Sequence, residues 1–171
     1  ETGHHDHVNS IDSLLERYDL PIYINKLEAD FWKKSYDNLI LTDSDDNFNL
    51  GKSLITSIHT PGHTPGSSCY SFDKNLIAGD TLFVFGCGRC DLHGGNPEKM
   101  YGSLKRLKKN LSRDTIIMPG HNYSVKRKST MHEEIDGNPF FSFNNMRDFV
   151  QYRMHTHDKI REEPYGPITD L

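Results

Sequence analysis

The stretch Thr2-Gly3-His4-His5-Asp6-His7 places three histidines and one aspartate within six residues. Three later turns combine a glycine with an imidazole or a carboxylate: Thr60-Pro61-Gly62-His63, Ala78-Gly79-Asp80 and Met118-Pro119-Gly120-His121. All four turns, the first included, are expected at the ends of strands. Small turns that contain glycine let the backbone come close, so short side chains from separate segments can converge on one point. Imidazole and carboxylate groups suit zinc or iron where thiolates are absent. The four turns therefore predict a metal centre.

Composition narrows the class of protein. The chain has 171 residues, a single-domain length, and it contains ten histidines. A net charge of −4 argues against general nucleic-acid binding, which needs a basic surface. No apolar run approaches the roughly 20 residues of a membrane helix, and no signal peptide is recognisable. The odd number of cysteines, three, favours a reducing compartment. We therefore expect a soluble, cytoplasmic protein that binds neither nucleic acid nor membrane.

Hydrophobic periodicity predicts an α/β architecture in layers, with strands and helices alternating. Ile11, Leu14, Leu15 and Tyr18 stand at helical spacing. The residues expected to face the core are Leu27, Phe31, Trp32, Met146, Phe149 and Val150. Polar and glycine-rich segments predict a turn over 43–49 and a loop over 85–95. Helices are predicted over 10–18, 25–36, 97–109 and 144–155, and strands over 20–24, 39–41, 54–58, 69–72, 76–78 and 115–118.

The order of the four motifs resembles that of the metallo-β-lactamase-fold superfamily. Its first motif is His-x-His-x-Asp-His, and a lone histidine, a bridging aspartate and a final histidine follow. The segment 86–101, with Gly-Cys-Gly-Arg at 86–89, resembles the branch that holds glyoxalase II (hydroxyacylglutathione hydrolase) and the persulfide dioxygenases. Together with the segments 138–150 and 164–167, it is most similar to the zinc-dependent hydrolases of bacterial polyketide biosynthesis. The resemblance implies one domain over 1–171 with an αββα sandwich fold.

The resemblance also implies the roles of individual residues. His4 and His63 would bind a first metal ion, and Asp80 would bridge it to a second. Zinc, as two ions, is the implied cofactor, and iron is the alternative. Asp6 and Asp80 would be catalytic because they orient the attacking hydroxide, while Arg89 and Tyr123 would contact the substrate. The implied ligands of the second metal ion are Asp6, His7 and His121.

Two departures from the family pattern concern the beginning of the sequence. Thr2 stands where the first motif has its first histidine, and a hydroxyl is a poor substitute for imidazole. The family also builds strands before this motif, whereas here the motif starts at residue 2. An N-terminally truncated chain with vector-derived residues at 1–3 is the simplest explanation. An evolved loss of the ligand is the alternative, and the sequence leaves both open.

Three functions are compatible with these residues. The first is a metal-dependent hydrolase that cleaves a thioester, acyl-glutathione-like or bound to an acyl carrier protein, through a metal-bound hydroxide. The chain has no Gly-x-Ser-x-Gly elbow, so a serine nucleophile is not expected. The second is a mononuclear non-haem iron persulfide dioxygenase, with a site of two histidines and one carboxylate. The third is a non-catalytic scaffold that binds thiols.

Other polar residues have more than one interpretation. Cys87 and Cys90 could form a redox pair or half a zinc site, but the chain has no second Cys-x-x-Cys. Arg89, between them, offers a planar fork of donors for a carboxylate or phosphate. Tyr123 could serve packing equally well. Lys105, Arg106, Lys108 and Lys109 predict a solvated helix face, with an acidic carrier protein as the alternative partner. His132, His155 and His157 are expected to be solvated.

Overall fold

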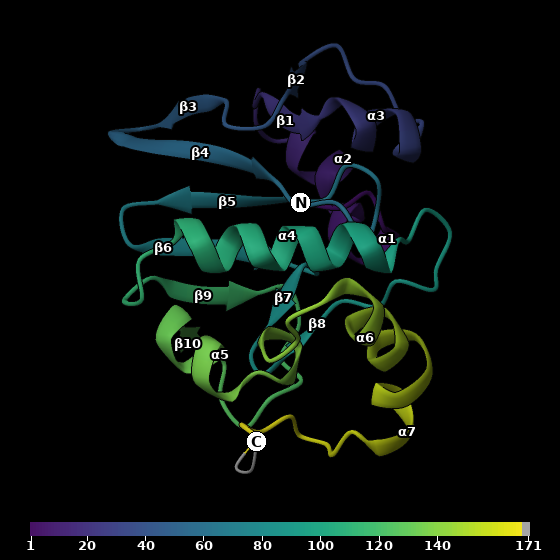
Figure 1. Cartoon of the computed structure of the whole chain (residues 1–171). Helices are drawn as coiled ribbons and strands as arrows, with labels where there is room; N and C mark the ends of the chain where they lie inside the picture. Colours follow the sequence, from purple (N-terminus) through teal and green to yellow (C-terminus); the bar gives the residue numbers. More distant parts are fainter. Residues whose placement is uncertain (169–171) are drawn as a thin grey trace.

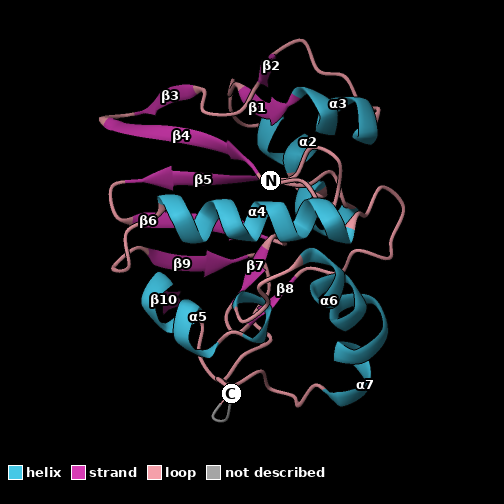
Figure 2. Ribbon diagram, viewed as in Figure 1, coloured by secondary structure: helices cyan, strands magenta, loops and turns pink. Residues whose placement is uncertain are grey.

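A six-stranded sheet organises the computed structural model, which describes residues 1–168 (Figures 1 and 2). The spatial order is β10-β9-β6-β5-β4-β3. Neighbouring strands pair antiparallel except β6 and β9, which run parallel and therefore need a crossover connection. The strands are β3 (Asn47–Leu50), β4 (Ser53–His59), β5 (Ser68–Phe72), β6 (Asn75–Gly79), β9 (Ile116–Pro119) and β10 (Ser129–Thr130).

Helix α4 (Pro97–Asn110) supplies that crossover and lies across one face of the sheet (Figure 1). Its start is fixed by Asn96, whose side chain accepts a hydrogen bond from the Lys99 N–H at 2.8 Å. Met100, Leu104 and Leu107 on the inward face of α4 are fully buried, so the predicted helix and its inward face are confirmed. They pack with strand residues of the same face, among them Cys69, Leu76, Ala78 and Ile117.

The C-terminal part completes the cover of this face with short helices. Phe149 is fully buried beside the Phe140 ring. One continuous helix over 144–155 was the expectation, and it is wrong in two respects. The helix changes to a π-helical turn, and Met146 is exposed. His157 is buried rather than solvated because its ring packs against Phe140. The elements are α5 (Met131–Gly137), a 3₁₀ turn (Pro139–Phe141), α6 (Met146–Gln151), the π turn (Tyr152–Thr156) and α7 (His157–Ile160).

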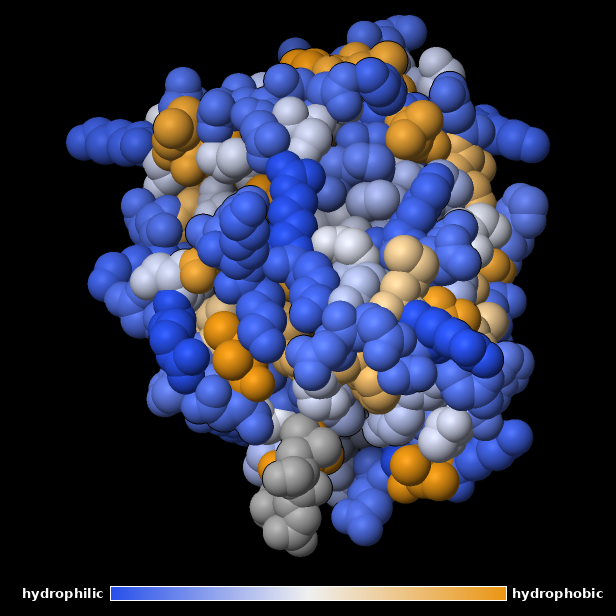
Figure 3. All heavy atoms as spheres, in the orientation of Figure 1, coloured by the Kyte–Doolittle hydropathy of each residue, from blue (hydrophilic) through white to orange (hydrophobic). Residues whose placement is uncertain are grey.

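The N-terminal elements other than α1 form a separate layer at the top of Figure 1, and α1 lies lower, at the level of α4. There β1 and β2 pair in parallel, and Figure 3 shows apolar atoms along this edge. The prediction that Leu27 faces the core is wrong, since it is 41% exposed, and Leu14 and Tyr18 of the predicted 10–18 helix are exposed as well. A helical pattern identifies an apolar face, but burial requires a surface to pack against it. The elements are α1 (His5–Val8), α2 (Ile11–Leu15), β1 (Ile22–Asn25), α3 (Lys26–Trp32) and β2 (Leu39–Thr42).

Four short strands, β3, β7, β8 and β10, lie where the sequence predicts none. The strand β7 (Leu82–Phe83) precedes the predicted 85–95 loop, its hairpin partner β8 (Gly86–Cys87) lies within that loop, and β3 begins inside the predicted 43–49 turn. Strands of two to four residues are too short to show a period in the sequence. Within residues 1–168, the strands outside the main sheet form only two-stranded sheets. None of the helices in this range combines the length and the apolar character that crossing a membrane would require.

Candidate metal centre

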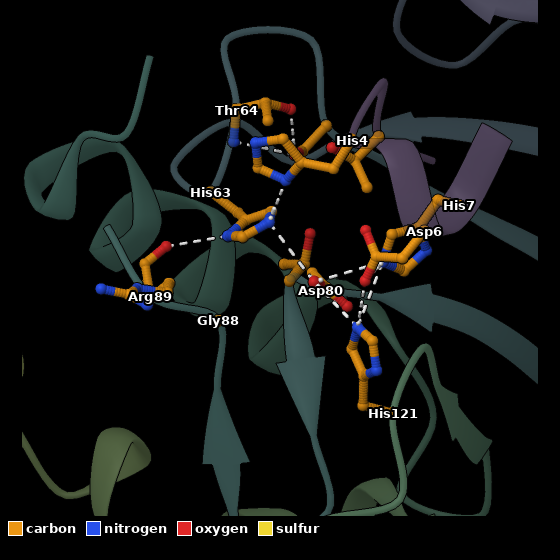
Figure 4. Close-up of polar contacts among 12 residues, drawn as sticks. His4, Asp6, His7, His63, Thr64, Asp80, Gly88, Arg89 and His121 are labelled. Atoms are coloured by element: carbon orange, nitrogen blue, oxygen red, sulfur yellow. Dashed lines mark hydrogen bonds and ion pairs between the residues drawn. The ribbon is translucent and has the colours of Figure 1, made fainter. Parts of the chain in front are cut away.

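All six predicted metal ligands come together at one end of the main sheet (Figure 4). His63 follows β4, Asp80 follows β6, and His121 follows β9. The first motif is placed differently from the others. His4 is the N-cap of α1, and Asp6 and His7 belong to that helix, so these ligands lie on a helical turn rather than at a strand end.

Asp80 lies at the middle of the group. Its Oδ2 atom is 3.3 Å from His63 Nε2, 3.4 Å from His7 Nε2 and 3.5 Å from His121 Nε2. Its Oδ1 atom is buried and has no hydrogen-bond partner among the described residues. The turn at Gly120 comes so near that a Cβ atom there would lie 2.6 Å from Oδ1, which explains the glycine. Three imidazoles therefore face one buried carboxylate.

Asp6, His7 and His121 form the second half of the centre. His7 Nε2 is 3.2 Å from His121 Nε2, and Asp6 Oδ2 is 3.4 Å from His121 Nε2. All three side chains offer a ligand atom within 4.8 Å of the others. This is the set that the resemblance implies for the second metal ion.

His4 and His63 form the first half, and it is less complete. His4 Nδ1 is 2.9 Å from His63 Nε2. Within residues 1–168, however, the groups of three mutually close ligands are Asp6–His7–His121 and Glu1–His7–Asp80, so His4, His63 and Asp80 do not form such a group. Thr2 is buried, and its hydroxyl donates a hydrogen bond to Glu28 Oε1 at 3.3 Å. Thr2 therefore adds no imidazole-like ligand to this half.

Two of the histidines are oriented through their outer ring nitrogens. Nδ1 of His63 lies 2.8 Å from the Arg89 carbonyl oxygen, and Nδ1 of His7 lies 2.7 Å from Glu1 Oε2. Such contacts fix the ring so that the other nitrogen faces a metal ion. Glu1 also accepts a hydrogen bond from the Asp80 N–H at 2.9 Å, a role that sequence reasoning missed because it treated residues 1–3 as vector-derived.

The electrostatics also suit a cation. Hydrogen bonds to the carboxylates of Asp80 and Glu1 raise the pKa of His7 to about 10. The same negative charge would attract a divalent ion in place of that proton. Burial and the neighbouring His63 lower the pKa of His4, which favours the neutral imidazole that a metal ion requires. With the unpartnered Asp80 Oδ1 atom, this set of nitrogen and oxygen donors fits zinc or iron.

A cavity of about 450 Å³ opens over the centre, a volume typical of small-molecule sites. Tyr123 lines it and stacks on the His121 ring at a centroid distance of 5.2 Å. The far wall was not predicted as part of the site, although Tyr165 belongs to the segment 164–167 that contributes to the resemblance. The C-terminal residues that form this wall are Arg153, Asp158, Arg161, Glu163 and Tyr165.

Arg89 also lines the cavity, but its side chain is already paired. Its Nε and Nη2 atoms donate to Asp91 at 2.8 and 2.6 Å, and this hydrogen-bonded fork lowers the pKa of Asp91 to about 2. The structure therefore shows two contacts of Arg89: its carbonyl holds His63, and its guanidinium pairs with Asp91.

The two cysteines beside Arg89 are free and buried. Burial raises the pKa of Cys90 to about 12 and that of Cys87 well above its usual value, so both thiols stay protonated near neutral pH. Reactive or metal-binding cysteines need the thiolate. The structure therefore gives the redox and structural-zinc interpretations no support.

These features define a metal-binding α/β domain with ligands from four separate turns, and its family is known. The metallo-beta-lactamase superfamily matches residues 3–121, and the chain belongs to this superfamily. It is 35% identical to the probable polyketide biosynthesis zinc-dependent hydrolase BaeB of Bacillus velezensis, covering 92% of this chain and 70% of that protein.

Two further proteins extend the comparison. The chain is 41% identical to the hydroxyacylglutathione hydrolase of Bartonella henselae over 123 residues, which are 71% of this chain and 46% of that protein. Its fold matches the crystal structure of ETHE1 from Myxococcus xanthus with a TM-score of 0.80 and 26% identity, covering 90% of this chain and 66% of that one. The chain thus spans about half to seven-tenths of the length of these relatives. The α/β fold of the superfamily and the branch implied by the motifs are confirmed.

Proposed function

We propose that this protein is a zinc-dependent hydrolase that cleaves a thioester. One observation carries the proposal: three imidazoles face the Oδ2 atom of the buried Asp80 at the floor of an open cavity. The descriptions of BaeB as a zinc-dependent hydrolase and of the Bartonella relative as a hydroxyacylglutathione hydrolase support the reaction class.

The donor set suggests how zinc would be held. His4 and His63 would bind one ion, the Asp6–His7–His121 set would bind a second, and Asp80 would touch both. When bound, zinc lowers the pKa of a coordinated water to near 7 and polarises a carbonyl oxygen. No acidic or basic side chain then has to generate the nucleophile alone.

The protein's own residues would orient the reactants. Asp6 is 60% exposed and faces the cavity, so its carboxylate can accept a hydrogen bond from the attacking water and hold its proton. The Tyr123 ring, stacked on His121, would cover one side of the acyl group. The Arg89 guanidinium would bind a polar or anionic group of the thiol carrier.

The carrier is proposed as glutathione-like or as an acyl carrier protein. Three arginines, Arg89, Arg153 and Arg161, line the cavity, and each pairs with an acidic residue whose place an anionic carrier group would take. On the basic helix face Arg106 likewise pairs with Asp45, at 2.7 Å. The free thiols of the chain support work in a reducing, cytoplasmic compartment.

Hydrolysis assays test this proposal directly. The zinc-loaded chain is given an acyl-glutathione, an acyl-pantetheine and the matching oxygen ester, and release of the thiol or alcohol is followed. We expect hydrolysis of at least one thioester, at a higher kcat/KM than for the oxygen ester, and loss of activity with a chelator. Equal rates on the two ester types would argue against thioester specificity.

A persulfide dioxygenase is the second candidate, favoured by a specific feature of the first half. His4, His63 and Asp80 supply two histidines and one carboxylate, the donor set of mononuclear non-haem iron oxygenases. Metal analysis of protein expressed without added metal separates the two candidates. Iron together with oxygen uptake supports the dioxygenase, and zinc together with thioester hydrolysis supports the hydrolase.

A non-catalytic, thiol-binding scaffold is the third candidate. A functional metal site couples metal binding to stability, so a chelator should lower the Tm of the metal-loaded protein. An unchanged Tm, with no activity on any thioester, would favour the scaffold.

A further inference from the structure

Glu28, a residue that no motif identifies, is fully buried on helix α3 next to the first half of the centre. It stands at the third position of the helix, where a glutamate commonly turns back to the N-cap backbone. Here the N-cap Asn25 side chain accepts from the Leu27 N–H, and the Glu28 carboxylate points to other segments. The capping role therefore does not account for Glu28.

Each carboxylate oxygen of Glu28 serves a different histidine-bearing segment. Oε1 accepts hydrogen bonds from the Thr2 hydroxyl and the Gly3 N–H, which directly precede His4. Oε2 accepts from the Thr64 hydroxyl at 2.7 Å and the Gly66 N–H at 2.9 Å, which directly follow His63. Figure 4 shows Thr64 with His4 and His63. One buried carboxylate thus connects two segments about 60 residues apart in the sequence.

The packing explains why both segments carry glycine next to α3. A Cβ atom at Gly66 would lie 2.1 Å from the Glu28 backbone nitrogen, and one at Gly3 would lie 2.8 Å from Trp32 Cβ. Each segment therefore lies directly against α3, and neither tolerates a side chain at this contact. The distance between the two segments is set by the helix and by the carboxylate between them.

We propose that Glu28 is a positioning residue that holds His4 and His63 at the spacing needed to bind one metal ion. The first half needs such a device because His4, His63 and Asp80 do not form a closed group of three, unlike the second half. Thr2 then acts through Glu28 rather than as a ligand, since its hydroxyl is engaged with the carboxylate. The inference rests on the proposed zinc centre.

The test measures zinc affinity by titration against a chromophoric chelator, with cobalt(II) absorption as a second readout of ligand geometry. Glu28→Gln keeps the shape but puts an NH₂ group against N–H or O–H donors. Loss of a partner outside the ligand set typically weakens metal affinity about 10- to 100-fold. We expect this loss for one zinc equivalent and a changed cobalt spectrum, while the other equivalent keeps its affinity.

Glu134→Gln is the matched control, because Glu134 is also fully buried and also accepts a backbone N–H, that of Phe85 at 3.1 Å. Its contacts lie in another part of the fold, so Glu134→Gln should keep both zinc affinities. A folded Glu28→Gln protein with wild-type affinity for every equivalent would overturn the proposal. Equal weakening in Glu134→Gln would overturn it as well.

A second pair of variants decides the matter if Glu28→Gln does not fold. Thr64→Val removes one donor to Glu28, whereas Thr64→Ser keeps the hydroxyl. We expect about a tenfold weaker zinc affinity for Thr64→Val, from the loss of one charge-assisted hydrogen bond, and near wild-type affinity for Thr64→Ser. Equal affinity in the two would contradict the positioning role. A wild-type chain that binds no zinc would contradict the proposed function, and the positioning role with it.

Discussion

The His4–His63 half of the metal centre is the more buried of the two halves, and the Asp6–His7–His121 half is the more exposed. The His63 side chain is 4% exposed and His4 is half-buried, while the side chains of His7, His121 and Asp6 are 13%, 28% and 60% exposed. The buried half is held from outside by the Arg89 carbonyl and, as proposed, by Glu28. The exposed half brings its three ligands within 4.8 Å of one another, and Glu1 holds His7 there.

This difference suggests that substitutions in the two halves affect the protein differently. The geometry of a buried pair that other elements hold depends on the integrity of the fold. A substitution in the buried half should therefore lower both the stability and the activity of the protein. The exposed set of three ligands is open to water and substrate. A substitution there should lower activity and leave stability unchanged. Asp80 is shared, because its Oδ2 atom faces histidines of both halves.

Asp80→Asn should have the largest effect, because it affects both halves at once. The amide keeps the shape but loses the negative charge that holds two cations close together. With a charge-assisted contact contributing about 1.5–3 kcal/mol to each of two ions, zinc binding should weaken by about 10²- to 10⁴-fold overall. We expect loss of at least one zinc equivalent together with most of the hydrolysis. Retention of two equivalents in elemental analysis would exclude the bridging role.

His63→Ala and His121→Ala compare the halves directly. Each removes a ligand, so each should reduce thioester hydrolysis by more than the roughly 10- to 100-fold typical of partners outside the ligand set. The double variant should lose little more than either single variant. Stability should differ, because only His63→Ala removes the partly buried hydrogen bond to the Arg89 carbonyl, which contributes about 0.5–1.5 kcal/mol. Thermal unfolding without zinc measures this, and equal Tm values would contradict the division between buried and exposed halves.

Arg89→Ala tests whether the cavity wall beside the buried half binds the carrier. Its effect on activity should be smaller than that of removing a ligand. The carbonyl that holds His63 remains, so metal binding should be kept while the side-chain contact to the carrier is lost. A contact far from the reacting carbonyl stabilises ground and transition states alike, so KM should rise about tenfold with kcat unchanged.

Asp91→Asn is the opposing variant, because it frees the Arg89 guanidinium and should lower KM. Steady-state kinetics on two thioesters, one with an anionic carrier and one with a small neutral thiol, are the measurement. If Arg89→Ala shifts KM equally for both carriers, Arg89 does not recognise the carrier.

Glu134 lies outside both halves and should affect stability alone. Burial raises its pKa from 4.5 to about 7. Between these values the folded protein binds more protons than the unfolded chain, so the free energy of unfolding should fall as pH rises through this window. The contribution is at most roughly 3 kcal/mol. Urea unfolding of zinc-free protein at several pH values should show this slope for the wild type and for the exposed Glu98→Gln control. Persistence of the slope in Glu134→Gln would assign it to another group.

Sequence patterning predicted the elements whose residues show a clear period or cap. The β5–β6 hairpin and α4 fall where predicted, because the polar residues 73–75 mark the turn of the hairpin and Asn96 caps a helix with a regular apolar face. The exposure of Leu14 and Leu27 could not be predicted, because it depends on whether another surface covers each helix. The π turn beyond α6 could not be predicted from local patterns either.

The ligand types of the centre follow from the motifs, but the contacts that support them do not. The Arg89 carbonyl would be present whatever side chain stood at position 89, so no residue pattern marks it. Glu28 occupies a helix position where glutamate is common for another reason, and only the three-dimensional arrangement shows which donors it faces. Contacts between segments distant in the sequence are the part that local patterns do not contain.

The parallel pairing of β6 with β9 has a consequence for biosynthesis. His121 follows β9, and β9 reaches its place only after α4 has crossed the sheet. A ribosome makes His4, His63 and Asp80 well before His121, and domains fold largely as units during synthesis. A nascent chain therefore carries an incomplete set of ligands until residue 121 has left the exit tunnel. Under the proposed function, zinc would therefore fill the whole centre only after translation of the fourth turn.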